Sequence, residues 1–370
     1  MNTKKKTFAI LIAIIGCLIS SFNSKLATAA INIRDTDDEA EISRLISIFI
    51  DGAIFPTMSA NNLLTSALFS HMTNTKGCLS NPFVHAIYGH SQNEVIAEYG
   101  FKNDIYGYIL GVDNVWISVD EKYFRLGTAL GYAHGKVASV GTIITGSFLE
   151  LNFGEGDTDY SHDVHTVKLF AAYESFNDKR LKTNIGIIFG YNYDINNSLG
   201  KNSLEFTSHS FSLGMKFIKN LYAYNGYQFG LWLQTNYNFI FRNTDGNKLS
   251  RFQDVDFILK SGYNSLVTVI GLNVEKEAFK HADRKLILSL KTGWECPVMQ
   301  RTDAVLFLTV TANEHYGVFK FRRPVKDVVI VSFNASQKLN NHWSIVGSYS
   351  ARFNKDFSAH NLSGGVEYAF

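Results

Sequence analysis

Residues 181–194, LKTNIGIIFGYNYD, alternate between two kinds of side chain. One set is apolar and becomes aromatic toward the end of the stretch: Leu181, Thr183, Ile185, Ile187, Phe189, Tyr191 and Tyr193. The other set is mostly Gly, Asn and charged residues. Because successive side chains of a strand point to opposite faces, the pattern predicts a strand with one apolar face and one face of small, polar side chains.

The same alternation recurs from residue 82 to the end of the chain and predicts twelve strands. They are 82–91, 104–117, 122–136, 161–175, 180–194, 206–219, 226–241, 255–276, 284–296, 326–338, 342–354 and 359–370. An even number of antiparallel strands can close into a barrel, which leaves no unpaired sheet edge in lipid. We therefore expect an all-β fold: a 12-stranded antiparallel transmembrane β-barrel with an N-terminal helical segment inside the pore.

The connections alternate between short turns and generally longer loops, as in bacterial outer-membrane barrels. We expect turns at 118–121, 176–179, 220–225, 277–283 and 339–341, and loops at 92–103, 137–160, 195–205, 242–254, 297–325 and 355–358. A soluble β-sandwich is the alternative, but its outer face would be charged. Charged residues make up only 18% of the chain, aromatics 14%, and the mean hydropathy is -0.03. A shift of strand register by one residue would turn Arg125 or Lys291 toward lipid. A charged side chain there costs about 2–4 kcal/mol of stability near the bilayer midplane.

The N-terminus has the pattern of an export signal. Three lysines, Lys4 to Lys6, precede an apolar core, and Ala27-Thr28-Ala29 is a small-x-small cleavage site. Processing as a lipoprotein at Cys17 is the alternative, since Gly16 precedes that cysteine. A cut after Ala29 removes four lysines and no acidic residue, so the formal net charge changes from +2 to −2. A basic nucleic-acid-binding surface is thereby excluded as a bulk property. We expect Cys78 and Cys296 to stay unpaired.

The end of the chain, HNLSGGVEYAF, carries an outward-facing series that ends in an aromatic residue: Leu362, Val366, Tyr368 and Phe370. A terminal aromatic is typical of barrels that the outer-membrane assembly machinery inserts. Together with the aromatic and Gly-rich strands at 106–137, residues 75–370 resemble the autotransporter β-domain family. The resemblance implies outer-membrane localisation, no enzymatic activity and no cofactor. We expect outer-membrane lipid, lipopolysaccharide and the assembly machinery as partners, no nucleic acid, and a monomer.

In that family a helix runs through the barrel and joins an exported passenger to the first strand. We expect a signal peptide at 1–29, a helical N-terminal segment at 30–75 and the barrel at 76–370. Residues 59–72, with Ser59 as N-cap, are the candidate pore helix, and a capping box at Thr36 opens an earlier one. No sizeable passenger is expected. Some family members cut themselves at an Asn-Asn pair inside the pore, and the resemblance makes Asn61 and Asn62 the candidates here.

Three functions fit the sequence: translocation or display of the short N-terminal segment, a passive or helix-plugged pore, and an adhesin acting through external loops. A basic cluster in one loop is the candidate adhesive patch; it consists of Lys320, Arg322, Arg323 and Lys326. His162 and His165 are a metal candidate, with solvated polar residues as the alternative. A hydrolase site at the rim would need Asp159, His162, Asp163 and Ser91 to meet, and their spacing does not predict this.

Overall fold

The computed structural model describes most of the barrel and one helix. The described residues are 56–72, 79–96, 99–117, 122–140, 143–144, 152–153, 159–176, 181–199, 206–243, 250–252, 255–281, 284–310, 313–321 and 327–369. All of them belong to the compact unit Ile33–Phe370. Residues 1–55, including the expected export signal and the helix expected from Thr36, lie outside the described residues, as does Cys78.

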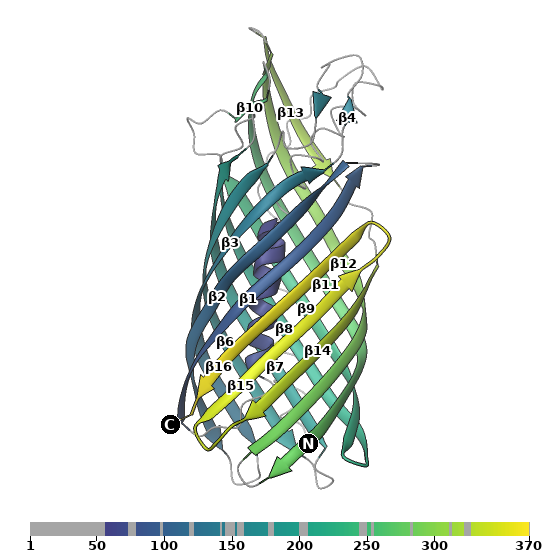
Figure 1. Cartoon of the computed structure of the whole chain (residues 1–370). Helices are drawn as coiled ribbons and strands as arrows, with labels where there is room; N and C mark the ends of the chain where they lie inside the picture. The colour runs from purple at the N-terminus through teal and green to yellow at the C-terminus, as the bar shows by residue number, and fades with distance from the viewer. Residues whose placement is uncertain are drawn as a thin grey trace, which may run out of the picture. The chain divides into compact units, whose positions relative to one another are not determined.

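Twelve long strands form a closed antiparallel barrel in which neighbours follow the order of the chain (Figure 1). They are β1 (Leu79–Ile96), β2 (Tyr99–Ile117), β3 (Tyr123–Val140), β6 (Tyr160–Phe176), β7 (Lys182–Ser198), β8 (Phe206–Tyr224), β9 (Tyr227–Asn243), β11 (Val255–His281), β12 (Arg284–Val310), β14 (Val328–Lys338), β15 (Trp343–Phe353) and β16 (Phe357–Tyr368). The last strand pairs with the first, from Phe83↔Glu367 to Asn93↔Phe357, and this pairing closes the ring. The twelve-stranded prediction is confirmed.

Four short strands lie beyond the ring at one end. They are β4 (Ile143–Ile144), β5 (Asn152–Phe153), β10 (Ser250–Phe252) and β13 (Asn313–Phe321). This end also carries the long connections, and we call it the loop end; the opposite end, with the short connections, is the turn end. Two loops expected from the sequence are wrong in extent. Residues 92–103 are mostly strand, and β12 continues through 297–310, because ladder pairing with the neighbouring strand extends to Glu94↔Gly100 and to Asp256↔Thr309 and so satisfies the backbone.

Two predicted turns are also shorter than expected. In the one predicted at 277–283, β11 continues to His281 and β12 begins at Arg284. The segment 220–225 is mostly strand, and β8 and β9 are joined by Asn225 and Gly226 alone. Both residues have positive φ, 47° and 78°. Positive φ at both central positions is the requirement of a type I′ turn, for which Asn-Gly is the preferred pair.

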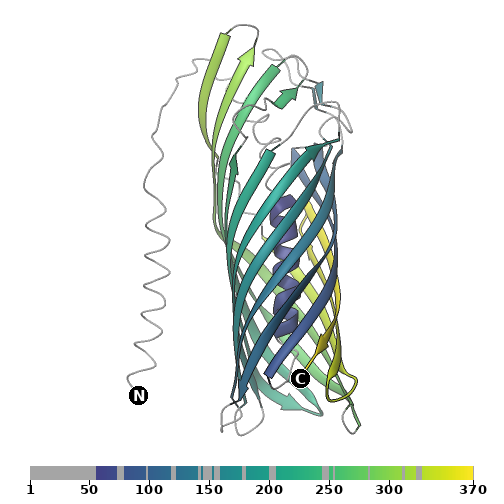
Figure 2. The ribbon, with the colours of Figure 1, turned by 90° about the vertical axis from the view of Figure 1, so that its left-hand side faces the viewer.

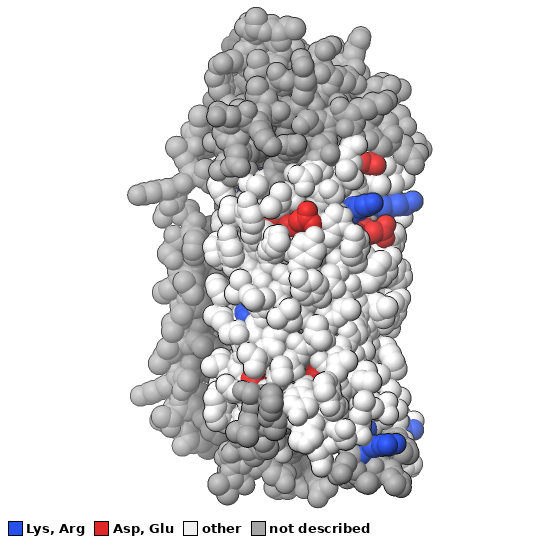
Figure 3. All heavy atoms as spheres, turned by 60° about the vertical axis from the view of Figure 1, so that its left-hand side comes forward, with Lys and Arg blue, Asp and Glu red and all other residues white. Residues whose placement is uncertain are grey.

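The outer face is apolar around the ring, as the alternation predicts. Leu130 is 56% exposed and pairs with Leu110 and Val167, which are also exposed. The opposite positions point inward, so Arg125 and Lys291 are each only 4% exposed. Figure 3 shows the result on one face, where the charged side chains gather mainly near the two ends of an uncharged band. In the described part of the chain, no helix has the length and apolarity to cross a membrane.

Aromatic side chains border this band at both ends. At the turn end Trp116 packs beside Phe124, with ring centroids 5.7 Å apart, and Trp343 beside Tyr368 at 4.8 Å. Toward the loop end, Tyr and His side chains meet on neighbouring strands: Tyr106 with His134, Tyr132 with His165, Tyr193 with His209, and Tyr349 with His360. Amphipathic rings of this kind favour the two membrane–water interfaces, so the band between them is the lipid-facing surface.

The sequence suggests that small polar side chains line the whole barrel interior, but the structure shows two different halves. On strands β1 to β7 the interior carries a buried apolar strip that includes Ile87, Ile105, Ile109, Val164 and Ile188. On β8 to β12 it is mainly polar, with Ser210, Asn238 and Lys291 among the inward-facing residues. The apolar half is explained by a helix, residues 56–72, whose side chains belong to the same core cluster. Figure 2 shows this helix within the barrel.

Candidate functional site: the helix in the barrel lumen

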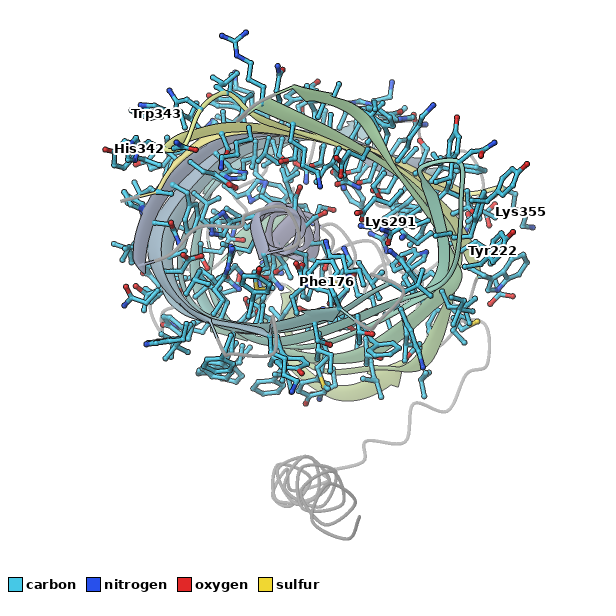
Figure 4. The ribbon with its side chains drawn as sticks, turned by 90° about the horizontal axis from the view of Figure 1, so that it is seen from below. Phe176, Tyr222, Lys291, His342, Trp343 and Lys355 are labelled. Atoms are coloured by element: carbon cyan, nitrogen blue, oxygen red, sulfur yellow. The ribbon has the colours of Figure 1, made fainter. Side chains whose placement is uncertain are left out.

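The central helix, residues 56–72, is surrounded by strands (Figure 4). It is already helical at Pro56, so Ser59 lies inside it and is not the N-cap that the sequence suggested. Proline suits the first turn because its φ is fixed and its missing N–H has no helical partner there. Apolar residues cover one side and pack on the apolar strip of β1 to β7; they are Ala60, Leu63, Leu64, Ala67, Leu68, Phe69 and Met72.

Polar residues at a spacing of four form a stripe on the first turns of the helix. Thr57 donates to the carboxylate of Asp194 on β7. Four residues on, Asn61 donates through Nδ2 to Asn238 Oδ1 at 2.6 Å. Thr65 continues the stripe and accepts a hydrogen bond from Lys168 Nζ at 3.1 Å. Because residues i and i+4 share a helix face, this stripe meets polar side chains from several strands.

Lys168, on β6, is the centre of the contacts made by this polar stripe. Its side chain is fully buried, and Nζ donates to Asn61 Oδ1 at 2.8 Å as well as to Thr65. Asn192 Nδ2 donates to the same Asn61 oxygen at 3.2 Å. Both ends of the Asn61 amide are therefore engaged by the barrel wall, and Asn61 supplies a partner for three buried side chains: Lys168, Asn192 and Asn238.

We expect Asn61→Ala to lower the free energy of unfolding by about 1–3 kcal/mol, because it leaves the buried Lys168 amine and the Asn192 amide without one partner each. Denaturant unfolding of the barrel in lipid vesicles measures this. Asn62→Ala is the matched control: Asn62 is half-buried in the same helix turn, and its replacement should change stability by under about 0.5 kcal/mol. Equal losses for the two variants would contradict the assigned contacts.

The last turn of the helix is held by a charged cluster. His71 Nδ1 lies 2.7 Å from Glu367 Oε1 on β16, and Nε2 lies 2.7 Å from Asp113 Oδ2 on β2. Arg125 Nη1 is 3.1 Å from the same Asp113 oxygen, and Asn81 Nδ2 donates to the other at 2.8 Å. The side chains of His71, Asp113 and Glu367 are at most 2% exposed. The imidazole therefore lies between two buried carboxylates, one of which is also paired with Arg125.

These two sets of contacts fix the direction of the helix. Thr57, at its start, meets Asp194 near the loop end of β7. His71, at its end, meets Asp113 and Glu367, which lie near the turn end of β2 and β16. The chain therefore passes down the barrel from the loop end to the turn end, where β1 begins with Leu79.

The candidate residues from the sequence fall in different places. Asn61 is buried in the contacts above, and Asn62 follows it in the helix. On β16, Leu362 and Val366 are exposed on the outer face and Tyr368 is half-buried, while Phe370 lies outside the described residues. Of the basic cluster, Lys320 is in β13; Arg322, Arg323 and Lys326 lie outside the described residues.

The histidine pair proposed as a metal candidate is wrong. His162 is fully buried in the lumen, whereas His165 is exposed on the outer face. Two positions three apart in a strand point to opposite faces, so the two rings cannot share an ion. The rim hydrolase is not assembled either. Asp163 faces outward, where it bonds to Tyr132 and His134, while His162 faces the lumen.

Sequence reasoning missed the residues that hold the helix: Asp113, Lys168, Asn192, Asn238 and Glu367. Each is a polar residue on the wet side of a strand pattern. The available signal was the pair Asn61 and Thr65 in the predicted helix, with Thr57 four residues before Asn61, because these residues require polar partners if the helix is enclosed.

No protein-family model matches the chain, and no curated protein does so either. Solved structures do match. The translocator domain of the autotransporter NalP from Neisseria meningitidis has a TM-score of 0.57 at 13% identity, covering 88% of this chain and 99% of that one. The β-domain of the Bordetella autotransporter BrkA has a TM-score of 0.52 at 12% identity, covering 79% of this chain and 100% of that one. This chain has the fold of an autotransporter β-domain. The transport unit of the autotransporter AIDA-I from Escherichia coli also matches, with a TM-score of 0.51 at 11% identity, covering 82% of this chain and 97% of that one.

An autotransporter-type barrel accounts for the exterior as well as the strand order. A closed ring of antiparallel strands with an apolar outer band and aromatic borders is the architecture of bacterial outer-membrane proteins. The protein is therefore an integral barrel of the bacterial outer membrane. In such barrels the short connections face the periplasm and the longer ones face the outside of the cell, so the turn end is periplasmic and the loop end external.

Proposed function

We propose that this autotransporter-type barrel displays the short segment that precedes its central helix on the cell surface. The observation that supports the proposal is the direction of the helix. Thr57 lies toward the loop end, by its bond to Asp194, and His71 lies toward the turn end, by its bonds to Asp113 and Glu367. The described helix therefore begins, at Pro56, toward the external end of the barrel, which supports an external position for the segment before it.

An epitope inserted between Asn32 and Ile33 tests the proposal on intact cells. We expect antibody to bind it without permeabilisation of the outer membrane. The control carries the same epitope between Asn225 and Gly226, in the β8–β9 turn at the opposite end of the barrel. That epitope should be detected only after permeabilisation. Detection of the Asn32 epitope only after permeabilisation would place the segment in the periplasm and overturn display.

The processing of the chain is part of the proposal: 1–29 as signal peptide, 30–75 as the helical N-terminal segment and 76–370 as the barrel. The intact mass of the purified protein distinguishes three forms. We expect a chain that begins at Ala30. A lipid-modified chain that begins at Cys17 would show lipoprotein processing, and a chain that begins at Asn62 would show cleavage between Asn61 and Asn62.

The assembly partners follow from the last strand. We propose that Leu362, Val366, Tyr368 and Phe370 form the recognition signal for the barrel-assembly machinery. The outward exposure of Leu362 (53%) and Val366 (39%) supports this, because a recognition surface must be accessible before the ring closes. We further propose that the barrel is a monomer in contact with outer-membrane lipid and lipopolysaccharide.

A helix-plugged pore is the second candidate function, and burial of the helix favours it. An α-helix with side chains is about 10–12 Å across. Eight-stranded barrels are filled by their own side chains, and 16-stranded ones leave an aqueous channel. A twelve-stranded barrel lies between them, so one helix is a fitting plug.

A further inference from the structure

Three buried side chains from separate parts of the chain meet at the turn end of the lumen. They are His71 from the central helix, His85 from β1 and Glu367 from β16. One nitrogen or oxygen atom from each lies within 4.8 Å of the others. The residues are 0%, 1% and 2% exposed. Two imidazoles and a carboxylate are a donor set that divalent transition metals prefer in proteins.

His85 is the member that the ion pairs described above do not explain. Neither of its ring nitrogens has a hydrogen-bond partner among the described residues, and the same holds for Glu367 Oε2. His85 Nε2 points toward Glu367, 3.4 Å from Oε1. A buried polar group without a partner is costly, so its position calls for a ligand.

The place of His85 depends on the glycine opposite it. His85 pairs with Gly365 on β16, and a Cβ at Gly365 would lie 2.4 Å from Cδ2 and 2.5 Å from Cγ of the His85 ring. Any side chain larger than hydrogen would displace the imidazole. The closing seam between β1 and β16 is thus shaped to hold this ring beside Glu367.

We propose that His71, His85 and Glu367 bind one divalent transition-metal ion of the zinc class, which clamps the end of the central helix to the β1–β16 seam. Zinc ligands at about 2.0–2.2 Å in tetrahedral geometry are about 3.3–3.6 Å apart. The His85–Glu367 separation of 3.4 Å lies within this range. His71 Nδ1, at 2.7 Å from Glu367 Oε1, must move back by at least about 0.6 Å as the ion replaces the proton between them.

Asp113 acts as a positioning residue for this site. Its Oδ2 lies 2.7 Å from His71 Nε2, so Nδ1 is the nitrogen that faces Glu367. A carboxylate on the far nitrogen of a metal-binding histidine fixes the ring and raises its basicity. Arg125 Nη1 contacts Asp113 at 3.1 Å and holds that carboxylate in turn.

Cobalt and zinc titrations of the full-length protein test the proposal. The untagged barrel is purified in detergent, stripped with a chelator and titrated with Co²⁺, whose visible absorption reports coordination. We expect saturation at one Co²⁺ per chain and displacement by one Zn²⁺. His85→Gln should weaken binding at least about tenfold, and Gly365→Ala should weaken it as well because it displaces the ring.

His162→Gln is the matched control, since His162 is another fully buried lumen histidine outside the cluster. It should leave binding unchanged. Heat-modifiable migration on gels verifies that each variant is folded; if His85→Gln does not fold, Gly365→Ala and the stoichiometry of the natural chain decide. Absence of saturable 1:1 binding by the natural chain, or equal binding by folded His85→Gln, would overturn the metal site.

Discussion

Deletion of residues 30–72 should convert a barrel that passes little ion current into a conducting pore. In planar bilayers, we expect the full chain to insert with little current and the deleted chain to give a stable conductance step at each insertion. The physical reason is that the helix occupies the interior, where Ala60, Leu64 and Leu68 are fully buried. Its removal exposes the inward side chains of the twelve long strands to water.

A second deletion, of residues 30–50 alone, is the control for this result. It removes most of the segment before the helix and leaves the helix in place, so its current should match that of the full chain. If the full chain and the 30–72 deletion conduct equally, the helix does not plug the barrel and the second candidate function is eliminated.

Replacement of Leu130 by Arg should destabilise the barrel by about 2–4 kcal/mol in lipid vesicles, the cost of a charge near the bilayer midplane. Leu130 lies in the middle of β3, 56% exposed on the outer face. Its cross-strand neighbours Leu110 and Val167 offer the arginine no partner. Equilibrium unfolding by denaturant measures the change.

Leu221→Arg is the matched control because it introduces the same side chain near the turn end of β8, where Leu221 is 53% exposed. Near an interface the expected cost is about 0–1 kcal/mol. Losses of equal size at the two positions would mean that depth in a bilayer does not determine them, which would contradict the lipid-facing assignment.

The strands were predictable because their information is local. Within β7, Phe189 faces outward and Ile188 faces the lumen, as a period of two requires. Strand ends were less predictable, because pairing with a neighbour decides where a strand stops. The Asn225-Gly226 turn is an exception, since its type I′ preference is written in two adjacent residues.

The contacts of the helix were not predictable, because they join residues far apart in the chain. His71 and Glu367 are separated by 296 residues, and Asn61 and Asn238 by 177. Nothing in the neighbourhood of Glu367 distinguishes it from other single charges on the wet side of a strand. Only the closed ring, with the helix inside it, brings these groups within bonding distance.

The bond between His71 and Glu367 also has a consequence for the assembled barrel. Its two partners come from the first described element and from the final strand, so it requires both the helix in the lumen and β16 in place beside β1. A barrel that has this contact therefore has its helix in the lumen and its last strand paired with its first.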